Sequence, residues 1–363
     1  MKIAYITRGP FGVMGGAASY MIPHVMAKQT PVLVCSPHSP RSKEHIVFSD
    51  DTTDVRNVHA GNREGILLKI YRYLDSFQPD IVHIFQNPNC LYYLENLKGA
   101  FPKAKWVLDF RTQINSEDKK HVRTLRKRFF MAHLMADHIF SQSIHTIGSS
   151  LPLRLKPFRE LPIGLDVEAF PAREKTESEL RRFLFVGLIA KQRKLEVLID
   201  AFNKYAVSAD SEATLDLIGG GDALEELRNR QSILGTNSVR FIGPLSQSEL
   251  GQRMSQYDAG IAYVPGGAYQ WAPSLKSLEY SAAGLSVFAS ATKGHRDYQK
   301  RFGFDFELFP NTEDGLVNAL VHARNSKNWS TSIARNKEAV LRFDWKEIIA
   351  KDLVPVYEKI LKR

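Results

Sequence analysis

RFLFVGLIAKQRKLEVLIDAF, residues 182–202, contains the pattern that decides the fold. An apolar run of strand length ends at Gly187, a basic loop follows, and apolar residues then recur at helical spacing. A strand, a short loop and a helix in this order form the repeating unit of parallel α/β sheets. Further units follow, with strand-like runs at TLDLIGGG (214–221) and LSVFAS (285–290). We therefore expect residues 166–345 to fold as one α/β domain.

The first half of the chain has the same alternation. Its strand-like runs are KIAYIT (2–7), PVLVCS (31–36), DIVHIF (80–85), KWVLDF (105–110) and HIFSQS (138–143). Two prolines and one glycine within 161–171 suit a linker, and 363 residues are too many for one ordinary core. We predict two α/β domains, 1–165 and 166–345, followed by a C-terminal helix, 346–363, that Pro355 interrupts.

Composition excludes several classes of protein. The hydrophobic fraction is 44% and the charged fraction 24%, which is typical of globular chains and not of disordered ones. No apolar run could span a bilayer, and the first residues lack the features of a secretory signal. Cys35 and Cys90 cannot form a disulfide framework, and no Cys/His cluster has zinc spacing. We expect a cytoplasmic protein without a bound metal.

The positive charge is concentrated in the first half. The formal net charge is +10, and residues 1–166 contain 22 Lys and Arg against 14 Asp and Glu, a balance of +8. This asymmetry indicates an anionic partner for the first domain: a membrane surface, a phosphorylated lipid or a nucleic acid.

Three clusters could bind an anionic ligand. The turn after the first strand contains Gly15 and Gly16, where backbone amides could approach a phosphate, although a surface loop explains the glycines equally well. The loop after Gly187 contains Lys191, Arg193 and Lys194, which could neutralise a diphosphate or could simply be solvated. In PSLKSLE (273–279), Lys276 and Glu279 share a helix face, as an exposed pair or as part of a site in which the carboxylate accepts ribose hydroxyls.

The order and spacing of these segments resemble the retaining glycosyltransferases of the family 4 type, which have the GT-B architecture of two Rossmann-like domains facing each other across a cleft. Residues 182–202 are similar to the family's F-V-G-R-L strand, K-G loop and L-I-x-A-F helix. PSLKSLEYSAAGLSVFAS (273–290) is similar to its glutamate-bearing helix and next strand, and LPIGLDVEAF (161–170) to its P-N-G-V-D segment. The last helix is similar to the one that crosses back onto the first domain.

The resemblance implies roles for individual residues. Arg193 and Lys194 match the diphosphate-gripping basic residue and the glycine after it, and we expect both to be catalytic. Glu279 matches the residue that binds the ribose. The other implied donor-binding residues are Gly15, Gly16, Ile242, Gly243, Ser274, Leu275 and Lys276, with the base bordered by Ile242 and Gly243.

Four positions depart from the family pattern. Leu188 stands in place of an arginine, and Trp271 in place of the glutamate assigned to the transferred sugar. Asp109 lies at the end of the fourth expected strand and Arg111 directly after it, where the family has a histidine. We expect Asp109 to act in catalysis and Arg111 and Trp271 to contact the sugar or acceptor; His83 fits better as a core histidine.

The implied reaction transfers a sugar from a nucleoside diphosphate sugar, with uridine as the expected base, to a saccharide or lipid-linked acceptor in glycan or envelope polysaccharide synthesis. The resemblance also implies retained anomeric configuration, no metal and no cofactor. A GT-B-fold epimerase or phosphorylase is the alternative enzyme class. A basic nucleic-acid-binding protein is a third hypothesis, but no recognised nucleic-acid module is present and we expect no such partner.

A basic helix is expected in SEDKKHVRTLRKRFFMAHLMADH, residues 116–138. Val122, Leu125, Phe129 and Ala132 would share one face. Either this face packs on the domain's own sheet beneath a solvated basic face, or the helix docks the protein on an anionic inner membrane surface. The membrane residues of the second hypothesis are Arg126, Lys127 and Arg128.

Overall fold

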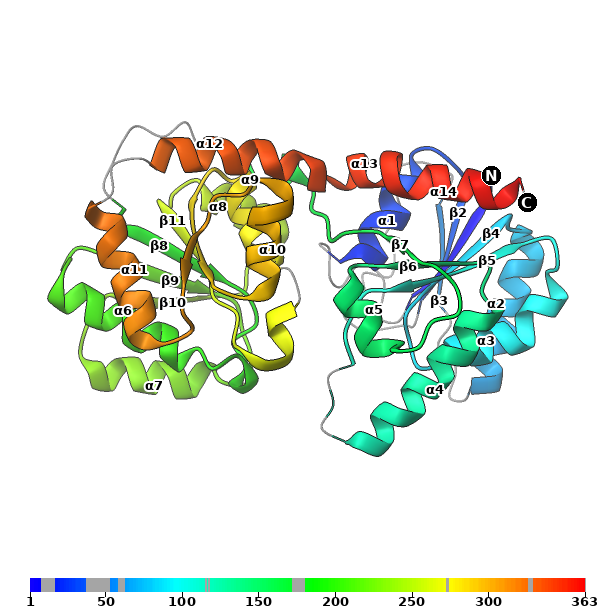
Figure 1. Cartoon of the computed structure of the whole chain (residues 1–363), viewed down its shortest axis with the longest axis horizontal. Helices are drawn as coiled ribbons and strands as arrows, with labels where there is room; N and C mark the ends of the chain where they lie inside the picture. The colour runs from blue at the N-terminus through cyan, green and yellow to red at the C-terminus, as the bar shows by residue number, and fades with distance from the viewer. Residues whose placement is uncertain are drawn as a thin grey trace. The chain divides into compact units, whose positions relative to one another are not determined.

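The computed structural model describes residues 1–7, 17–36, 53–57, 63–114, 116, 118–171, 180–271, 274–325 and 329–362. These residues form two compact units, the first comprising Met1–Gly164 with Trp345–Arg363 and the second comprising Leu165–Asp344. Each unit is a parallel sheet covered by helices (Figure 1). The predicted α/β class is therefore confirmed for both.

Apolar runs form the central strands of the first unit. Its described strands lie side by side in the order β3-β2-β1-β4-β5-β6-β7, and all are parallel. They are β1 (Ile3–Ile6), β2 (Val32–Ser36), β3 (Thr53–Asn57), β4 (Ile81–Phe85), β5 (Lys105–Phe110), β6 (His138–Ser141) and β7 (Arg159–Glu160). β1, β2 and β4 are buried along their whole length, as expected for a parallel sheet covered on both faces.

Helices cover both faces of this sheet. One buried cluster joins the sheet to α2 (Arg63–Phe77), α3 (Cys90–Leu97), α4 (Lys119–Met135) and α5 (Ile144–Ser150). The other joins it to α1 (Ala18–Ala27) and the C-terminal segment. A short 3₁₀ turn, Lys98–Ala100, continues α3.

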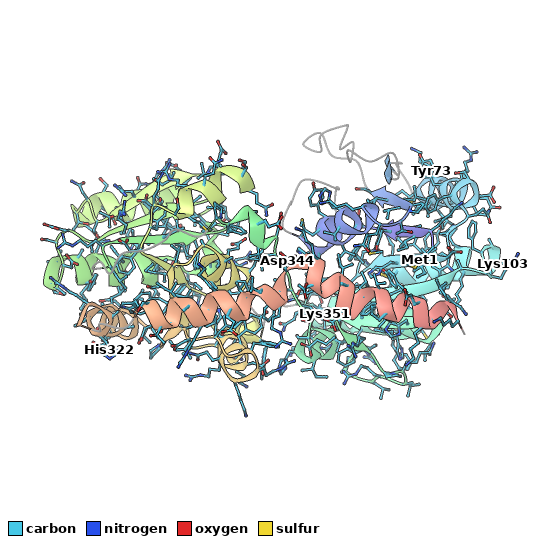
Figure 2. The ribbon with its side chains drawn as sticks, turned by 90° about the horizontal axis from the view of Figure 1, so that it is seen from above. Met1, Tyr73, Lys103, His322, Asp344 and Lys351 are labelled. Carbon is cyan, nitrogen blue, oxygen red and sulfur yellow. The ribbon has the colours of Figure 1, made fainter. Side chains whose placement is uncertain are left out.

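The C-terminal segment consists of α13 (Trp345–Ile348), a π-helical turn (Ile349–Leu353) and α14 (Val354–Leu361). The interruption expected at Pro355 is present, because the π turn ends at Leu353, two residues before this proline in the first turn of α14. Lys351 lies on the exposed side of the segment (Figure 2), while Trp345 and Tyr357 are buried in the first unit.

The second unit repeats the arrangement. Its parallel sheet has the order β10-β9-β8-β11-β12-β13, formed by β8 (Arg182–Val186), β9 (Thr214–Ile218), β10 (Val239–Gly243), β11 (Ala259–Ala262), β12 (Ser286–Ser290) and β13 (Glu307–Phe309). The described helices are α6 (Glu196–Ser208), α7 (Leu224–Leu234), α8 (Gln247–Met254), α9 (Leu275–Ala282), α10 (Lys293–Phe302), α11 (Glu313–Asn325) and α12 (Trp329–Val340). Short 3₁₀ turns include Lys191–Arg193 and Gly267–Trp271.

No helix in the described part of the chain is both long enough and apolar enough to cross a membrane.

Candidate functional site

Two loops at the carboxyl ends of β8 and β9 pack backbone against backbone. Gly219 has φ +148°, and a Cβ placed there would lie 1.9 Å from the carbonyl oxygen of Gly187. Gly221 has φ +155°, and its Cβ would lie 2.2 Å from the carbonyl oxygen of Ile189. Both positions therefore require glycine. This close contact lies at the sheet edge where open parallel α/β sheets bind ligands.

Lys276 of α9 lies against this edge. A Cβ built on Gly187 would be 2.8 Å from Lys276 Cε and 3.2 Å from its Nζ, and Nζ is 5.2 Å from the centre of the Phe185 ring. Burial, followed by the positive charge of Arg193, lowers the pKa of Lys276 to about 8. The ammonium is therefore poorly solvated, and an anionic ligand would relieve the cost of its charge.

Glu279 lies one turn further along α9 and is half-buried. Burial raises the pKa of its carboxyl to about 7, although the positive charge of Lys276 opposes the shift. Ser274, the N-cap of α9, makes no side-chain capping bond to the first amides of the helix. The start of α9 thus combines uncapped amides, half-buried Leu275, a cation and a carboxylate.

The loop after β8 contributes Arg193 and Lys194. The Arg193 guanidinium is 4.5 Å from the centre of the Tyr269 ring and half-buried, so the aromatic face restricts its position. Lys194 is exposed and has the left-handed backbone conformation, with φ 49°. Lys191 is also exposed, and its Nζ lies 3.7 Å from a carboxylate oxygen of Glu226. Arg193 is the best fixed of the three cations.

Ile242 and Gly243 end strand β10. The register with β9 shifts between Phe241 and Gly243, so Ile242 is the extra residue of a bulge. The carbonyl oxygen of Gly243 accepts a hydrogen bond from the amide of Gly219 at 3.0 Å. Both predicted base-bordering residues therefore adjoin the glycine contact between the loops.

Trp271 ends the 3₁₀ turn Gly267–Trp271, and Lys293 Nζ lies 3.7 Å from the centre of its ring. A sugar that stacked on this ring face would have to replace Lys293. Leu188 is 53% exposed, so the expected arginine position presents an apolar side chain. Gly15 and Gly16 lie outside the described residues.

Asp109 and Arg111 lie in the first unit and join an interior network. Asp109 is fully buried, and its Oδ2 accepts a hydrogen bond from Arg111 Nε at 2.7 Å. Arg111 Nη1 also donates to the carbonyl oxygen of Leu161 at 2.8 Å. The structure therefore places the Asp109 carboxylate away from solvent, and its catalytic role stays a prediction without support from its position.

His83 is the third member of this network, and its position agrees with the core histidine expected from the sequence. Its ring is fully buried, with Nε2 3.3 Å from Asp109 Oδ2 and Nδ1 2.6 Å from the Tyr357 hydroxyl. Burial lowers the pKa of His83, although Asp109 opposes the shift. A neutral ring that donates from Nε2 to Asp109 and accepts from Tyr357 satisfies both contacts.

The apolar face expected on α4 packs inward, with Leu125, Phe129 and Ala132 buried and Val122 half-buried. Arg126 and Lys127 are exposed and Arg128 is half-buried. Among the described residues, no group of three His, Cys, Asp or Glu side chains could hold a metal ion.

Three residues of the second unit were not singled out from the sequence. Tyr269 and Lys293 contact Arg193 and Trp271, as described above. His295 is fully buried; its Nδ1 lies 2.7 Å from the carbonyl oxygen of Ser290, and burial lowers its pKa to about 4. No motif indicated Tyr269 or Lys293, because their contacts arise from packing between elements that are not adjacent in sequence.

Residues 181–326 match the model of the family described as glycosyl transferases group 1. This range includes the glycine contact, Arg193 and α9. No curated protein matches the sequence.

Solved structures match over nearly the whole chain. The protein is similar to Anabaena Alr3699/HepE in complex with UDP, with TM-score 0.76, 16% identity and full coverage of both chains. A glycosyltransferase from Rickettsia africae ESF-5 gives TM-score 0.76 and 15% identity, covering 100% of this chain and 99% of that one. The lipopolysaccharide outer core galactosyltransferase WaaB gives TM-score 0.66 and 16% identity, covering 99% and 100%. The chain therefore has the predicted GT-B fold, and its second unit contains the segment that matches the group 1 glycosyltransferases.

Proposed function

We propose that this protein is a glycosyltransferase that moves a sugar from a nucleoside diphosphate sugar, with uridine as the base, to a saccharide or lipid-linked acceptor in glycan or envelope polysaccharide synthesis. The observation that carries the proposal is the start of α9, where a poorly solvated lysine and a half-buried glutamate lie beside the glycine contact within the matched segment. Structural neighbours of the same fold hold UDP.

The proposed donor site assigns one task to each group. Glu279 accepts the ribose hydroxyls, and Lys276 with the amides at Ser274 and Leu275 binds the diphosphate. Lys276 thereby replaces the cation absent at Leu188, because its ammonium lies against the adjacent Gly187. Ile242 and Gly243 border the base, and Gly15 and Gly16 are the remaining proposed donor-binding residues.

In the proposed reaction the bond between the sugar C1 and the diphosphate oxygen breaks, and the oxygen keeps the electron pair. Arg193, assisted by Lys194, stabilises the negative charge that develops there. An acceptor hydroxyl forms the new bond to C1 and loses its proton to the leaving phosphate or to solvent. Retention of the anomeric configuration requires attack from the face that the diphosphate leaves.

Replacing Glu279 with alanine should weaken UDP binding by about 2 kcal/mol, roughly 30-fold, because the charged acceptor for the ribose hydroxyls is lost. Calorimetric titration with UDP measures this directly. Glu225→Ala is the control, since Glu225 is an exposed carboxylate of α7 paired with Arg228 at 2.9 Å. Equal UDP affinity in the Glu279 variant and the wild type would exclude Glu279 from the site.

UDP affinity should depend on pH in a bell-shaped manner. It should rise as the pH passes about 7, where Glu279 ionises, and fall above about 8, where Lys276 loses its proton. His295, with a pKa of about 4, stays neutral over this range. Titrations between about pH 6 and about pH 9, a range that brackets the pKa values of both residues, measure the profile.

Two variants test which residue causes each side of this pH profile. Glu279→Gln should remove the acidic limb and Lys276→Met the alkaline limb. Without ligand, the raised pKa of Glu279 means that its contribution to stability is lost as the pH rises through about 7. The lowered pKa of Lys276 means that its contribution is lost as the pH falls through about 8. An unaltered profile in both variants would contradict the assignment.

The membrane partner belongs to the same proposal. Arg126, Lys127 and Arg128 attach the first unit to an anionic membrane surface, with about 1 kcal/mol from each well-placed cation. Changing all three to glutamate should abolish co-sedimentation with phosphatidylglycerol vesicles, and salt should weaken the wild-type interaction. Equal sedimentation with neutral and anionic vesicles would exclude this attachment.

A further inference from the structure

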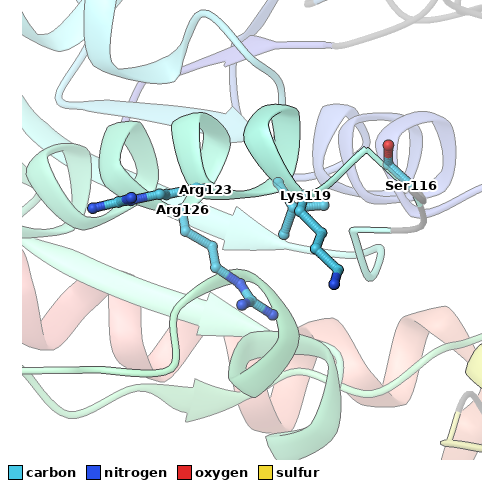
Figure 3. Close-up of a pocket in the computed structure, with 5 residues that line it drawn as sticks. Ser116, Lys119, Arg123 and Arg126 are labelled. Atoms are coloured by element: carbon cyan, nitrogen blue, oxygen red, sulfur yellow. The ribbon is translucent and has the colours of Figure 1, made fainter.

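A cavity of about 320 Å³ lies at the start of α4 and is lined by Ser116, Lys119, Val122, Arg123 and Arg126. Lys119 is the first residue of α4, which follows the loop at the carboxyl end of β5. This edge of a parallel sheet is where open α/β folds bind ligands. The side chains of Lys119 and Arg126 extend to the same side of the helix (Figure 3).

The three cations around this cavity lack acidic partners among the described residues. Lys119, Arg123 and Arg126 are all exposed, and none is in an ion pair with a described carboxylate. Elsewhere in the same unit, Lys98 pairs with Asp137 at 2.8 Å and Arg159 with Asp352 at 3.1 Å. The cavity is therefore lined by three positive charges that no described carboxylate neutralises.

A hydrogen bond to the backbone holds the Arg126 side chain in position. Its Nε donates to the carbonyl oxygen of Ser149 at 2.9 Å, which orients the guanidinium and leaves both terminal nitrogens as donors. Asp118 caps α4 by accepting from the amides of Lys120 at 2.8 Å and His121 at 3.1 Å. These amides are already bonded, so an anion at the cavity would be bound mainly by side chains.

We propose that this cavity binds a phosphate or diphosphate ester of the acceptor substrate. Three cations with one hydroxyl, that of Ser116, suit a multiply charged group with several acceptor oxygens, and guanidinium groups bind phosphate in a bidentate manner. Val122 supplies an apolar wall for the group that the phosphate carries. That this ligand belongs to the acceptor rests on the proposed function, in which Arg193, Lys276 and Glu279 of the other unit bind the donor.

Inorganic pyrophosphate is the probe for this site. The full chain is titrated calorimetrically with pyrophosphate in saturating UDP, which occupies the proposed donor site. The cavity variant changes Lys119, Arg123 and Arg126 to glutamine. The matched control changes Arg72, Lys103 and Lys120 to glutamine, which removes the same charge from exposed positions of the same unit outside the cavity lining. Circular dichroism checks that both variants fold.

Pyrophosphate affinity should fall at least about tenfold in the cavity variant and by less than about threefold in the control. An equal loss in both variants would mean that only the general positive charge of the first unit attracts pyrophosphate, and would overturn the inference. The inference would also be overturned if the wild-type protein did not bind pyrophosphate.

The sources of phosphate are separated with phosphatidylglycerol vesicles. If the cavity variant loses vesicle binding but keeps pyrophosphate binding, the three cations serve a membrane surface and the inference is wrong. If UDP itself does not bind, the proposed function fails separately. The comparison of cavity and control variants without UDP then still tests the cavity, because the donor residues are identical in both.

Discussion

Replacing Arg193 with alanine should lower the turnover number at saturating donor by about 10²- to 10³-fold, as does loss of one donor to a developing oxyanion. The Tyr269 ring restricts the Arg193 guanidinium, so the charge is in place before the leaving diphosphate develops its own. The donor is first chosen by thermal-shift screening of the protein against a panel of sugar nucleotides. UDP release from that donor is then measured, and the turnover number and the Michaelis constant are determined separately. Only interactions that strengthen in the transition state lower the turnover number when lost.

Lys191→Ala is the matched control for Arg193. Lys191 carries the same charge two residues earlier but is exposed and lies near Glu226, so its removal should change turnover by less than about threefold. If saturating donor restored the wild-type rate in Arg193→Ala, Arg193 would contribute to donor binding and not to leaving-group stabilisation. An equal loss in both variants would indicate a nonspecific charge effect.

The sequence predicts most of the central sheets because those strands are nearly continuous apolar runs. It does not identify β3 or β13, which lie at sheet edges. β3 has the polar sequence TDVRN, and β13 has only three residues. Edge strands pair on one side only and need no long apolar run, so neither length nor periodicity distinguishes them from loops.

Candidate site residues could be found where a local motif carried the signal. Lys194 was identified from its place in the basic loop, and the structure adds the reason for the family's glycine there: the backbone is left-handed. The contact between Lys293 and Trp271 could not be predicted, because it joins α10 to a 3₁₀ turn more than 20 residues earlier. Sequence motifs identify the residues of one loop but not the partners that tertiary packing brings to them.

Asp109 shows that a residue chosen from its position in the sequence can lie in the protein interior. The family has a histidine after the fourth strand, and this position suggests a role for Asp109 and Arg111. The network that contains them is completed by Tyr357, which lies about 250 positions later and bonds His83. The resemblance implies that the last helix returns to the first domain, but no local pattern could show that its Tyr357 contacts His83 in this network.

The position of Asp109 predicts a large loss of stability on its removal. Asp109→Ala leaves the Arg111 guanidinium, whose side chain is only 11% exposed, without its counter-ion, which should cost about 3–5 kcal/mol. Hydrogen exchange followed by mass spectrometry should show faster exchange across β4, β5 and α14, by about 10²-fold or more. Peptides of the second unit, residues 165–344, serve as the internal reference and should be unaffected.

Two comparisons test the cause of this loss. Asp352→Ala removes a surface carboxylate that pairs with Arg159 in the same unit, and should cost only about 0–1 kcal/mol. Burial alone would raise the pKa of Asp109, but Arg111 and His83 outweigh it and hold the pKa below its usual value. A lowered folded-state pKa gives stability that is present above the unfolded-state pKa and is lost as the pH falls through the folded-state value. The wild type should therefore approach the exchange rates of Asp109→Ala only in strong acid, and a difference that persisted in strong acid would show that lost packing, not lost charge, explains the variant.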